Sequence, residues 1–313
     1  MKKNCGLAIA NGGLAIERDV SRQSAIRNRQ GSALLLVLWA IVTMSLAVIG
    51  VVEYVGYNLD ETQALNRDFR LRQIAESGLA FAFHPQVDSE DPLLSGALDD
   101  GGRFEVKLQS ETARLNINFL IRTGREDVLE RLFTNNWKLS SSDSRMVIAG
   151  LIRWMGRTGD SPETLEVFRN FDTIEQMTEV DSMAFVEEKK PDWRDSFTVL
   201  GEGRTDLNDA TADIVDAIFR VGDRRAQRFV QYRLGADKKE HTLDDQKFEQ
   251  ISVVGSVLGI PQNQMESFNP LITLEGTISR VESTATLGNH SKLIRVILNR
   301  KTSPQLIYKW EEM

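Results

Sequence analysis

The chain has 313 residues, a formal net charge of −7 and a hydrophobic fraction of 41%. A hydrophobic fraction of this size can bury a core, which excludes wholesale disorder, and the length allows more than one domain. The acidic balance argues against nucleic acid as the main partner, because phosphate binding needs a basic surface. Cys5 is the single cysteine, so the rest of the chain has neither a disulfide nor a thiol nucleophile.

The first expected element is an uncharged apolar run from Ala33 to Val52. A helix of this length spans about 30 Å, the thickness of a bilayer's hydrocarbon core. In lipid such a segment must be helical, because only a helix satisfies its own backbone groups. A buried core helix is the alternative, but core helices rarely run this long without a charge. We therefore expect a transmembrane helix over residues 32–53.

The flanking charges predict the orientation of this helix. Glu53, Asp60 and Glu61 follow it, and an excess of basic residues precedes it: Lys2, Lys3, Arg18, Arg22, Arg27 and Arg29. The basic side stays in the cytoplasm, so the rest of the chain should cross the membrane. The rival is a cleaved secretory signal, but its basic region is shorter and its apolar core has about 7–15 residues.

The junction between the basic leader and the apolar run is Arg29-Gln30-Gly31-Ser32. It resembles the cleavage site of type IV prepilins and type II secretion pseudopilins. In those families a membrane-embedded peptidase cuts after the glycine, and the apolar segment remains as the N-terminal helix of the mature subunit. The resemblance implies a prepilin-type leader over residues 1–31, cleavage between Gly31 and Ser32, and methylation of the mature subunit.

Beyond the span, the helical pattern continues over residues 53–83 and becomes amphipathic. The predicted apolar stripe recurs at three- and four-residue steps: Val55, Leu59, Leu65, Phe69, Ala75, Leu79 and Ala82. Pro85 closes the helix, because proline disfavours a helical conformation at the residue before it. The whole helix would have about 50 residues and measure roughly 75 Å.

The remaining chain predicts a helical block between strands. Residues 86–101 read as a loop, 102–109 as a strand, and 115–269 as mainly helical with a short strand signal at 197–200. The candidate helices are 126–133, 143–154, 164–168, 173–179, 210–219, 224–233 and 243–258. Strands follow at 271–284, 292–299 and 305–310, with a turn at Gly288-Asn289. This order predicts an α+β fold in which a helical domain, 115–270, is inserted between a helix and first strand, 54–114, and final strands, 271–313.

Several segments together resemble the K-type minor pseudopilins of the type II secretion system, the GspK family. They are Leu38-Trp39 in the span, the helix end Ala75–Ala80 (AESGLA), and two asparagine-bearing segments, 115–118 (LNIN) and 205–208 (TDLN). The resemblance covers nearly the whole chain. It implies a pilin-like fold, in which the long helix packs on a small antiparallel sheet, with a large inserted all-α domain of the helix-hairpin-helix or SAM-like kind.

The resemblance also implies a role. It indicates a non-enzymatic, single-pass inner-membrane subunit with a periplasmic C-terminal domain. Such a subunit caps the pseudopilus tip and promotes its assembly for protein export across the outer membrane. The implied partners are other minor pseudopilins of the I and J types, the major pseudopilin, the prepilin peptidase and inner-membrane lipid. The alternative is a membrane-anchored component of a type IV pilus or DNA-uptake system that binds through its helical domain.

Leu36 occupies the fifth position of the expected mature chain, where most pilins carry a glutamate. That glutamate is thought to offset the N-terminal ammonium of the subunit assembled ahead of it. A carboxylate in lipid without a partner is costly. A subunit with nothing ahead of it gains nothing from one, so Leu36 favours a place at the tip.

Other chemistry has weaker signals. Residues 218–223 (IFRVGD), followed by several arginines, resemble a helix-hairpin-helix module, but the second hairpin glycine is replaced by Asp223, and 179–182 (EVDS) has no glycine. We therefore expect no nucleic-acid partner and a protein-interaction surface instead. His84, His241 and His290 are scattered, and neither a Walker loop nor a dinucleotide fingerprint occurs, so we expect no catalysis.

Calcium is the one cofactor to consider, because the K-type family can carry it in the helical domain. Calcium prefers clustered carboxylate and carbonyl oxygens. The corresponding stretch after Trp154 offers only Asp160, Glu163 and Glu166, and Arg157 opposes a cation. The sequence favours an ordinary solvated loop, so no cofactor is certain.

Overall fold

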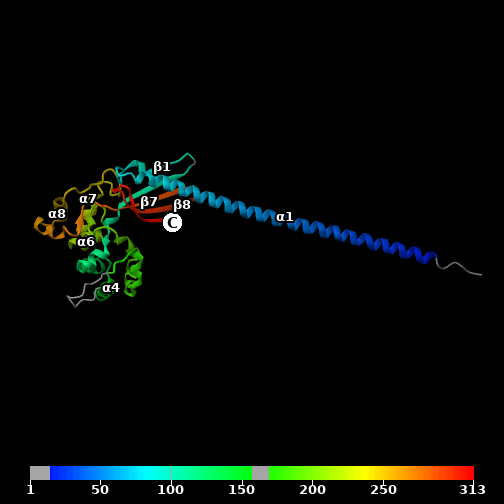
Figure 1. Cartoon of the computed structure of the whole chain (residues 1–313), viewed down its shortest axis with the longest axis horizontal. Coiled ribbons are helices and arrows are strands. Elements are labelled where there is room, and N and C mark those ends of the chain that lie inside the picture. The colour runs from blue at the N-terminus through cyan, green and yellow to red at the C-terminus, as the bar shows by residue number, and fades with distance from the viewer. Residues whose placement is uncertain (1–14, 100, 157–168) are drawn as a thin grey trace, which may run out of the picture. The chain divides into compact units, whose positions relative to one another are not determined.

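The computed structural model describes residues 15–99, 101–156 and 169–313, with side chains from residue 33 onward. The chain separates into two units, Met1–Asp68 and Phe69–Met313, which are described in turn. We call the second unit the head. Helix α1, Ala15–Ala82, begins in the first unit and ends in the head (Figure 1).

In the first unit α1 includes the whole predicted span and continues without a break. Leucine and alanine favour helix, and the run from Ala33 to Val52 contains no proline. The helix ends at Ala82, within one residue of the prediction, and Pro85 follows. It also includes residues 15–31, where no apolar period indicated a helix.

The head contains an antiparallel sheet of five strands. Their spatial order is β1 (Ser95–Ala97), β2 (Arg103–Ser110), β7 (Ser279–Leu287), β8 (His290–Asn299) and β9 (Leu306–Glu312). The strands predicted at 102–109, 292–299 and 305–310 are confirmed, and so is the Gly288-Asn289 turn, because Leu287 pairs with His290. Strand β1 lies in a segment predicted as loop, since Ser-Gly-Ala carries no apolar alternation. The predicted strand 271–284 is two strands, β6 (Ile272–Thr273) and β7.

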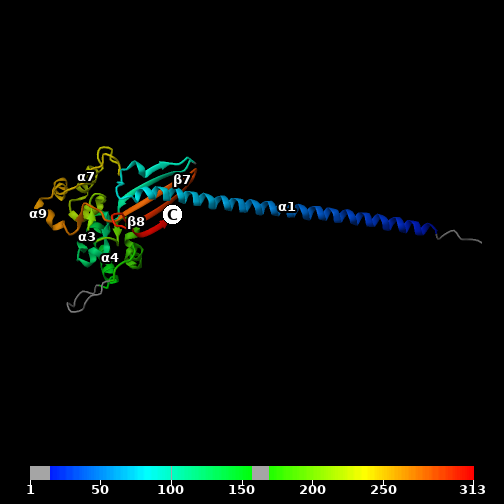
Figure 2. The ribbon, with the colours of Figure 1, turned by 45° about the horizontal axis from the view of Figure 1, so that its top comes forward.

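The last turns of α1 pack on one face of this sheet, beside β7 and β8 (Figure 2). A Cβ at Gly78 would lie 2.8 Å from Cγ2 of Val106 and 2.7 Å from Oγ of Ser283. The Ser283 hydroxyl donates a hydrogen bond of 2.8 Å to the carbonyl of Ala75. The missing side chain at Gly78 thus lets the helix backbone lie close to the sheet. The core at this contact consists of Leu71, Ile74, Ala75, Leu79, Ala82, Val87, Leu94, Phe104, Val106, Leu108, Val281, Ala285, Ile294, Val296 and Leu298.

The predicted apolar stripe on α1 is only partly correct. Its last members are buried, but Val55, Leu59, Leu65 and Phe69 are exposed, and burial begins at Leu71. The sequence period identifies a helix face, but it does not show how far along the helix a sheet covers that face.

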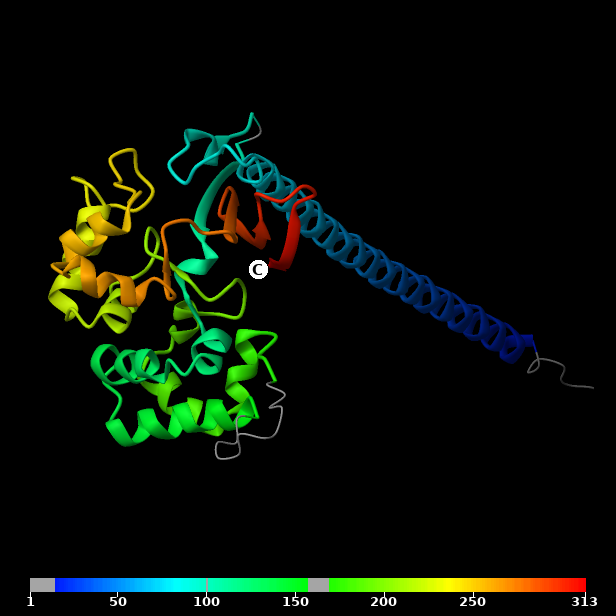
Figure 3. The same cartoon turned by 60° about the vertical axis from the view of Figure 1, so that its left-hand side comes forward.

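Between β2 and β7 the chain forms two lobes, drawn in green and in yellow to orange in Figure 3. The first lobe, residues 115–198, contains β3 (Leu115–Asn116), α2 (Ile117–Arg122), α3 (Glu126–Arg131), a π-helical turn η3 (Leu132–Asn136), α4 (Ser141–Trp154), η4 (Ile174–Glu179), η5 (Asp181–Met183), α5 (Ala184–Lys189), η6 (Trp193–Ser196) and β4 (Phe197–Thr198). The second lobe, residues 205–273, contains β5 (Thr205–Asp206), α6 (Ala212–Phe219), α7 (Asp223–Arg233), α8 (Ile251–Leu258), α9 (Gln262–Met265), η7 (Glu266–Phe268) and β6. Two further short 3₁₀ turns are η1 (Pro92–Leu94) and η2 (Glu111–Ala113).

Each lobe is closed by a parallel ladder of two residue pairs. Strand β3 pairs with β4, where Leu115 is opposite Phe197, and β5 pairs with β6, where Thr205 is opposite Ile272. The expectation of an all-α insertion therefore differs from the structure in these ladders, which are too short to leave a period-two pattern. One apolar core runs through both lobes.

Most of the candidate helices are confirmed. Helices α3, α4, α6 and α7 match four of them, whereas 173–179 is mainly the 3₁₀ helix η4 and 164–168 lies outside the described residues. The prediction for 243–258 is wrong in its first half, because only Ile251–Leu258 is helical and Leu243 is 83% exposed. Helices α2, α5 and α9 were not predicted, because six or fewer residues are too short for a clear period.

Candidate functional site

The apolar span is a long continuous run of exposed, mainly apolar residues. Every side chain from Ala33 to Val52 is exposed, including Leu36 at 72% and Trp39 at 66%. Within the described residues, α1 is long and apolar enough to cross a membrane, with a mean hydropathy of 2.7 over its most apolar window. The helix is therefore compatible with a single-pass membrane anchor.

The hydroxyl of Thr43, one of the two weakly polar residues of the span, is satisfied within the helix. The Thr43 hydroxyl lies 2.9 Å from the carbonyl of Trp39 and 3.0 Å from that of Ala40. Such internal bonding removes the cost of a free hydroxyl in an apolar medium. Tyr54 and Tyr57 follow the span, in the position where aromatic residues gather at a membrane interface.

The sequence-predicted site residues have different outcomes. Gly31 and Ser32 lie within the backbone of α1, and cleavage between them stays a prediction. Asp160, Glu163 and Glu166 lie outside the described residues. In the described ranges no group of three or more histidine, cysteine or acidic side chains is arranged to hold a metal ion.

The two asparagine-bearing segments hold the lobes closed. The Asn118 side chain donates to the carbonyl of Phe171 at 2.9 Å and accepts from its N–H at 2.8 Å. In the second lobe, Asn208 does the same with Phe248, at 3.0 and 2.8 Å. The sequence singled out these segments by resemblance. The structure shows that each side-chain amide pairs with the backbone of one distant residue, as a neighbouring strand would.

The helix-hairpin-helix resemblance corresponds to the turn between α6 and α7. Arg220 stands in a left-handed conformation with φ of 57°, and Gly222 has φ of 81°. The Gly222 N–H donates to Oδ1 of buried Asp216 at 2.6 Å. Exposed arginines follow on α7 at positions 224, 225 and 228. The hairpin is thus formed although its second glycine is replaced by Asp223, with Arg220 and Gly222 both in positive-φ conformations.

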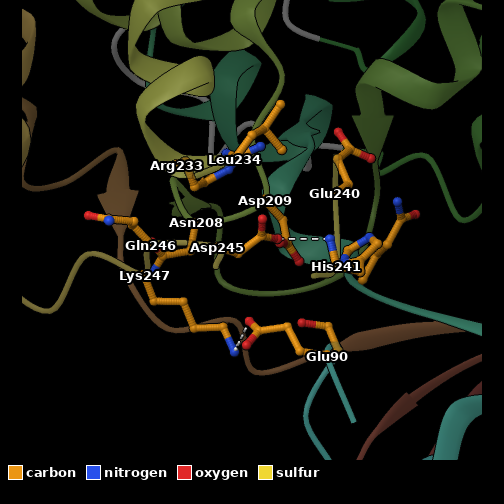
Figure 4. A pocket seen from close by; sticks show the side chains of 12 residues that line it. Glu90, Asn208, Asp209, Arg233, Leu234, Glu240, His241, Asp245, Gln246 and Lys247 are labelled. Carbon is orange, nitrogen blue, oxygen red and sulfur yellow. Dashed lines mark hydrogen bonds and ion pairs between the residues drawn. The ribbon is translucent and has the colours of Figure 1, made fainter. Parts of the chain in front are cut away.

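A small polar cavity of about 40 Å³ lies beside the second lobe (Figure 4). The buried Arg233 donates from Nη1 to the carbonyls of Leu207 and Ala210, at 2.9 and 2.8 Å. Burial lowers the pKa of Arg233, and the carboxylates of Asp209 and Glu240 oppose that change. Ligand sites for small molecules measure about 300–1,000 Å³, so this cavity holds only a few waters.

The rim of the same cavity ties two loops together. The backbone N–H of His241 donates to Oδ2 of Asp245 at 2.8 Å, and Lys247 pairs with Glu90 at 3.1 Å (Figure 4). His241 was expected to be solvated but is half-buried, with its Nε2 buried. His84 and His290 lie at the end of α1 and at the β7–β8 turn.

Comparison with known proteins supports the fold. No protein-family model and no curated protein matches the chain. Among solved structures, it is similar to one chain of the GspK-GspI-GspJ complex from the type 2 secretion system of enterotoxigenic Escherichia coli. The TM-score is 0.54 at 14% identity, over 82% of this chain and 98% of that chain. The chain has a pseudopilin-like fold. The predicted α+β class, with a long N-terminal helix, an antiparallel sheet and further helices, is confirmed.

The two edges of the pseudopilin-like sheet differ. Strand β1 is three residues long, whereas β9 has seven and exposes Leu306, Ile307, Tyr308 and Trp310 by 40% or more. Within the described residues, no strand pairs with the outer side of β9. Proteins normally protect long apolar edges, because these add strands from other chains. Strand β9 is therefore the edge better suited to protein contact.

Proposed function

We propose that this chain is a minor pseudopilin of the K type, a non-enzymatic subunit that caps the pseudopilus of a type II protein secretion system. It would be a single-pass inner-membrane protein with a periplasmic head. The likeness to a chain of the GspK-GspI-GspJ complex carries the proposal. The exposed span of α1 supports it, because an apolar helix of this kind can be stored in lipid and then join a bundle of similar helices.

The proposed place at the tip depends on two features. Leu36 puts no carboxylate into lipid and would leave the subunit ahead without a partner for its ammonium group. The two lobes between β2 and β7 enlarge the head, and a bulky head packs poorly inside a helical shaft. We propose that I- and J-type pseudopilins contact this head and that the major pseudopilin follows it.

The decisive experiment is the N-terminal sequence of the mature protein, produced with and without a prepilin peptidase. We expect Ser32 as the first residue only when the peptidase is present. A Gly31→Leu variant should keep its leader, and Gly12→Leu, within the leader, is the matched control that should be processed normally. A mature chain that begins elsewhere, or that is processed equally without the peptidase, contradicts the proposal. Co-purification with I- and J-type pseudopilins then separates a secretion role from a pilus role.

A second candidate is a DNA-uptake or pilus component, and the α6–α7 hairpin favours it. Backbone amides at such hairpins hold phosphate, and three exposed arginines follow Gly222. The acidic net charge opposes this candidate. Retention of the detergent-solubilised chain on heparin at moderate salt would favour it. Elution together with control proteins that do not bind heparin would favour the secretion role.

A further inference from the structure

A groove of about 250 Å³ lies between the sheet and the first lobe. On the sheet side it is lined by Arg280, Arg295 and Ile297, which alternate with residues buried against α1 and so belong to the opposite face. Aliphatic and aromatic side chains form much of its wall: Ile174, Val199, Leu200, Ile297 and Tyr308. Charged side chains of both signs form the rest of the lining, so the groove suits a ligand that has both an apolar and an ionic part.

Arg114 lines this groove, and its guanidinium group has long ion pairs but no hydrogen bond within the described chain. Its side chain is only 13% exposed, and its ion pairs to Glu111 and Asp195 measure 3.7 and 3.5 Å. In the described part of the chain this side chain makes no hydrogen bond. A guanidinium has five N–H donors, so this side chain has donor capacity that is not used within the described chain.

The other cations on the sheet side of the groove already have close partners. Arg280 donates from Nε to Oε2 of Glu111 at 2.9 Å, Arg295 pairs with Glu282 at 2.6 Å, and Lys309 pairs with Glu311 at 2.7 Å. Each of these cations therefore has a carboxylate closer to it than either ion partner of Arg114 is.

The charge on Arg114 is therefore incompletely compensated. Burial lowers the pKa of Arg114, Arg280 and Arg295 add to that effect, and Glu111 and Asp195 oppose it. Asp195 is 71% exposed, so solvent screens its contribution. An additional negative group at this position would stabilise the partly buried guanidinium.

We propose that this groove binds a carboxylate attached to an apolar group, with Arg114 holding the carboxylate and the wall around Ile174, Leu200 and Tyr308 holding the apolar part. The two carboxylate oxygens accept from the guanidinium in the planar, bidentate arrangement that arginine favours. Two sources share this chemistry: a small free acid and the C-terminal residue of a polypeptide. The site is independent of the proposed role in secretion.

The test is calorimetric titration of the full chain in a non-ionic detergent. The probes are N-acetyl-leucine and a hexapeptide ending in leucine, each compared with its C-terminal amide. We expect amidation and the Arg114→Met substitution each to lower affinity at least about tenfold, because each removes the charge-assisted pair. Arg114→Lys keeps the charge but not the fork and should retain part of the affinity. Arg122→Met, at an exposed position on α2, is the control and should bind as the unaltered chain does.

The outcomes separate the sources. Binding of both acids supports a site open to chain termini, and binding of N-acetyl-leucine alone supports a site for a small acid. Equal binding of the amides, unchanged binding by a folded Arg114→Met chain, or no binding of either acid at millimolar concentration would overturn the proposal. The thermal midpoint of each variant without probe shows that the fold is intact, and Arg114→Lys serves if Arg114→Met does not fold.

Discussion

The two lobes of the head close in the same way although their sequences differ. In the first, Asn118 pairs with the backbone of Phe171, and in the second, Asn208 pairs with that of Phe248. Each asparagine lies three residues beyond the start of a short parallel ladder. A side-chain amide carries one acceptor and a donor group, as a peptide unit does, so one residue can pair with a distant loop as a strand would. The comparison teaches that each lobe adds one side-chain amide to the short ladder that closes it.

The lobes differ in burial and in charge. Both bonds of Asn118 are buried, whereas those of Asn208 are partly buried. At the position two residues earlier, the first lobe has the neutral Asn116 and the second has Asp206. The first lobe should therefore be more sensitive to loss of its asparagine, and the second more sensitive to pH.

The largest effect is expected for Asn118→Leu. The substitution leaves the N–H and carbonyl of Phe171 buried without partners, which should lower the free energy of unfolding by about 2–4 kcal/mol. Urea unfolding of the detergent-solubilised chain, followed by near-ultraviolet circular dichroism, measures the change. Asn263→Leu, at an exposed position of α9, is the control and should stay within about 0.5 kcal/mol. Equal losses for the two variants would contradict the role of Asn118.

A smaller loss, about 1–2 kcal/mol, is expected for Asn208→Leu, because water can reach part of the site that the side chain leaves. The variant also loses the bond of 2.9 Å to the carbonyl of Leu274. The same unfolding measurement applies, and the double variant tests independence. Additive losses indicate that the lobes close separately, whereas a non-additive sum would show coupling through their shared core.

The smallest effect concerns Asp206 and its pH dependence. Burial, and then the charge of Asp209, raise the pKa of Asp206, while its bond from the Asn208 N–H opposes the shift. The native chain thus binds this proton more tightly than the unfolded chain. The stabilisation is complete below the unfolded pKa and is lost as pH rises through the native one. Asp206→Asn should be more stable than the unaltered chain at pH 7, with a difference that shrinks toward pH 4. Thermal midpoints that run parallel over this range would rule the effect out.

Sequence reasoning succeeded where one segment carries its own signal. The apolar span, the turn at Gly288 and helices such as α4 follow from local pattern and composition. It failed where contact between distant residues decides the structure. Strand β1 is held by β2 and not by its own residues, and Asn118 is 53 residues away from its partner.

The candidate sites show the same difference between local motifs and contacts of distant residues. The cleavage junction and Leu36 come from linear motifs, and the calcium prediction after Trp154 lies on residues outside the described ranges. The groove at Arg114 had no sequence signal, because it forms from strands and loops that are joined only in the folded chain. A single arginine before a strand gives no indication that the carboxylates near it lie closer to other cations in the folded chain.

The pair of bonds between Asn208 and Phe248 also indicates a position for a label. It fixes both ends of the intervening chain, in which Leu243 is 83% exposed. Lengthening a chain between fixed ends costs little closure entropy. A fluorophore or epitope grafted beside Leu243 should therefore label the head while the fold around it is retained.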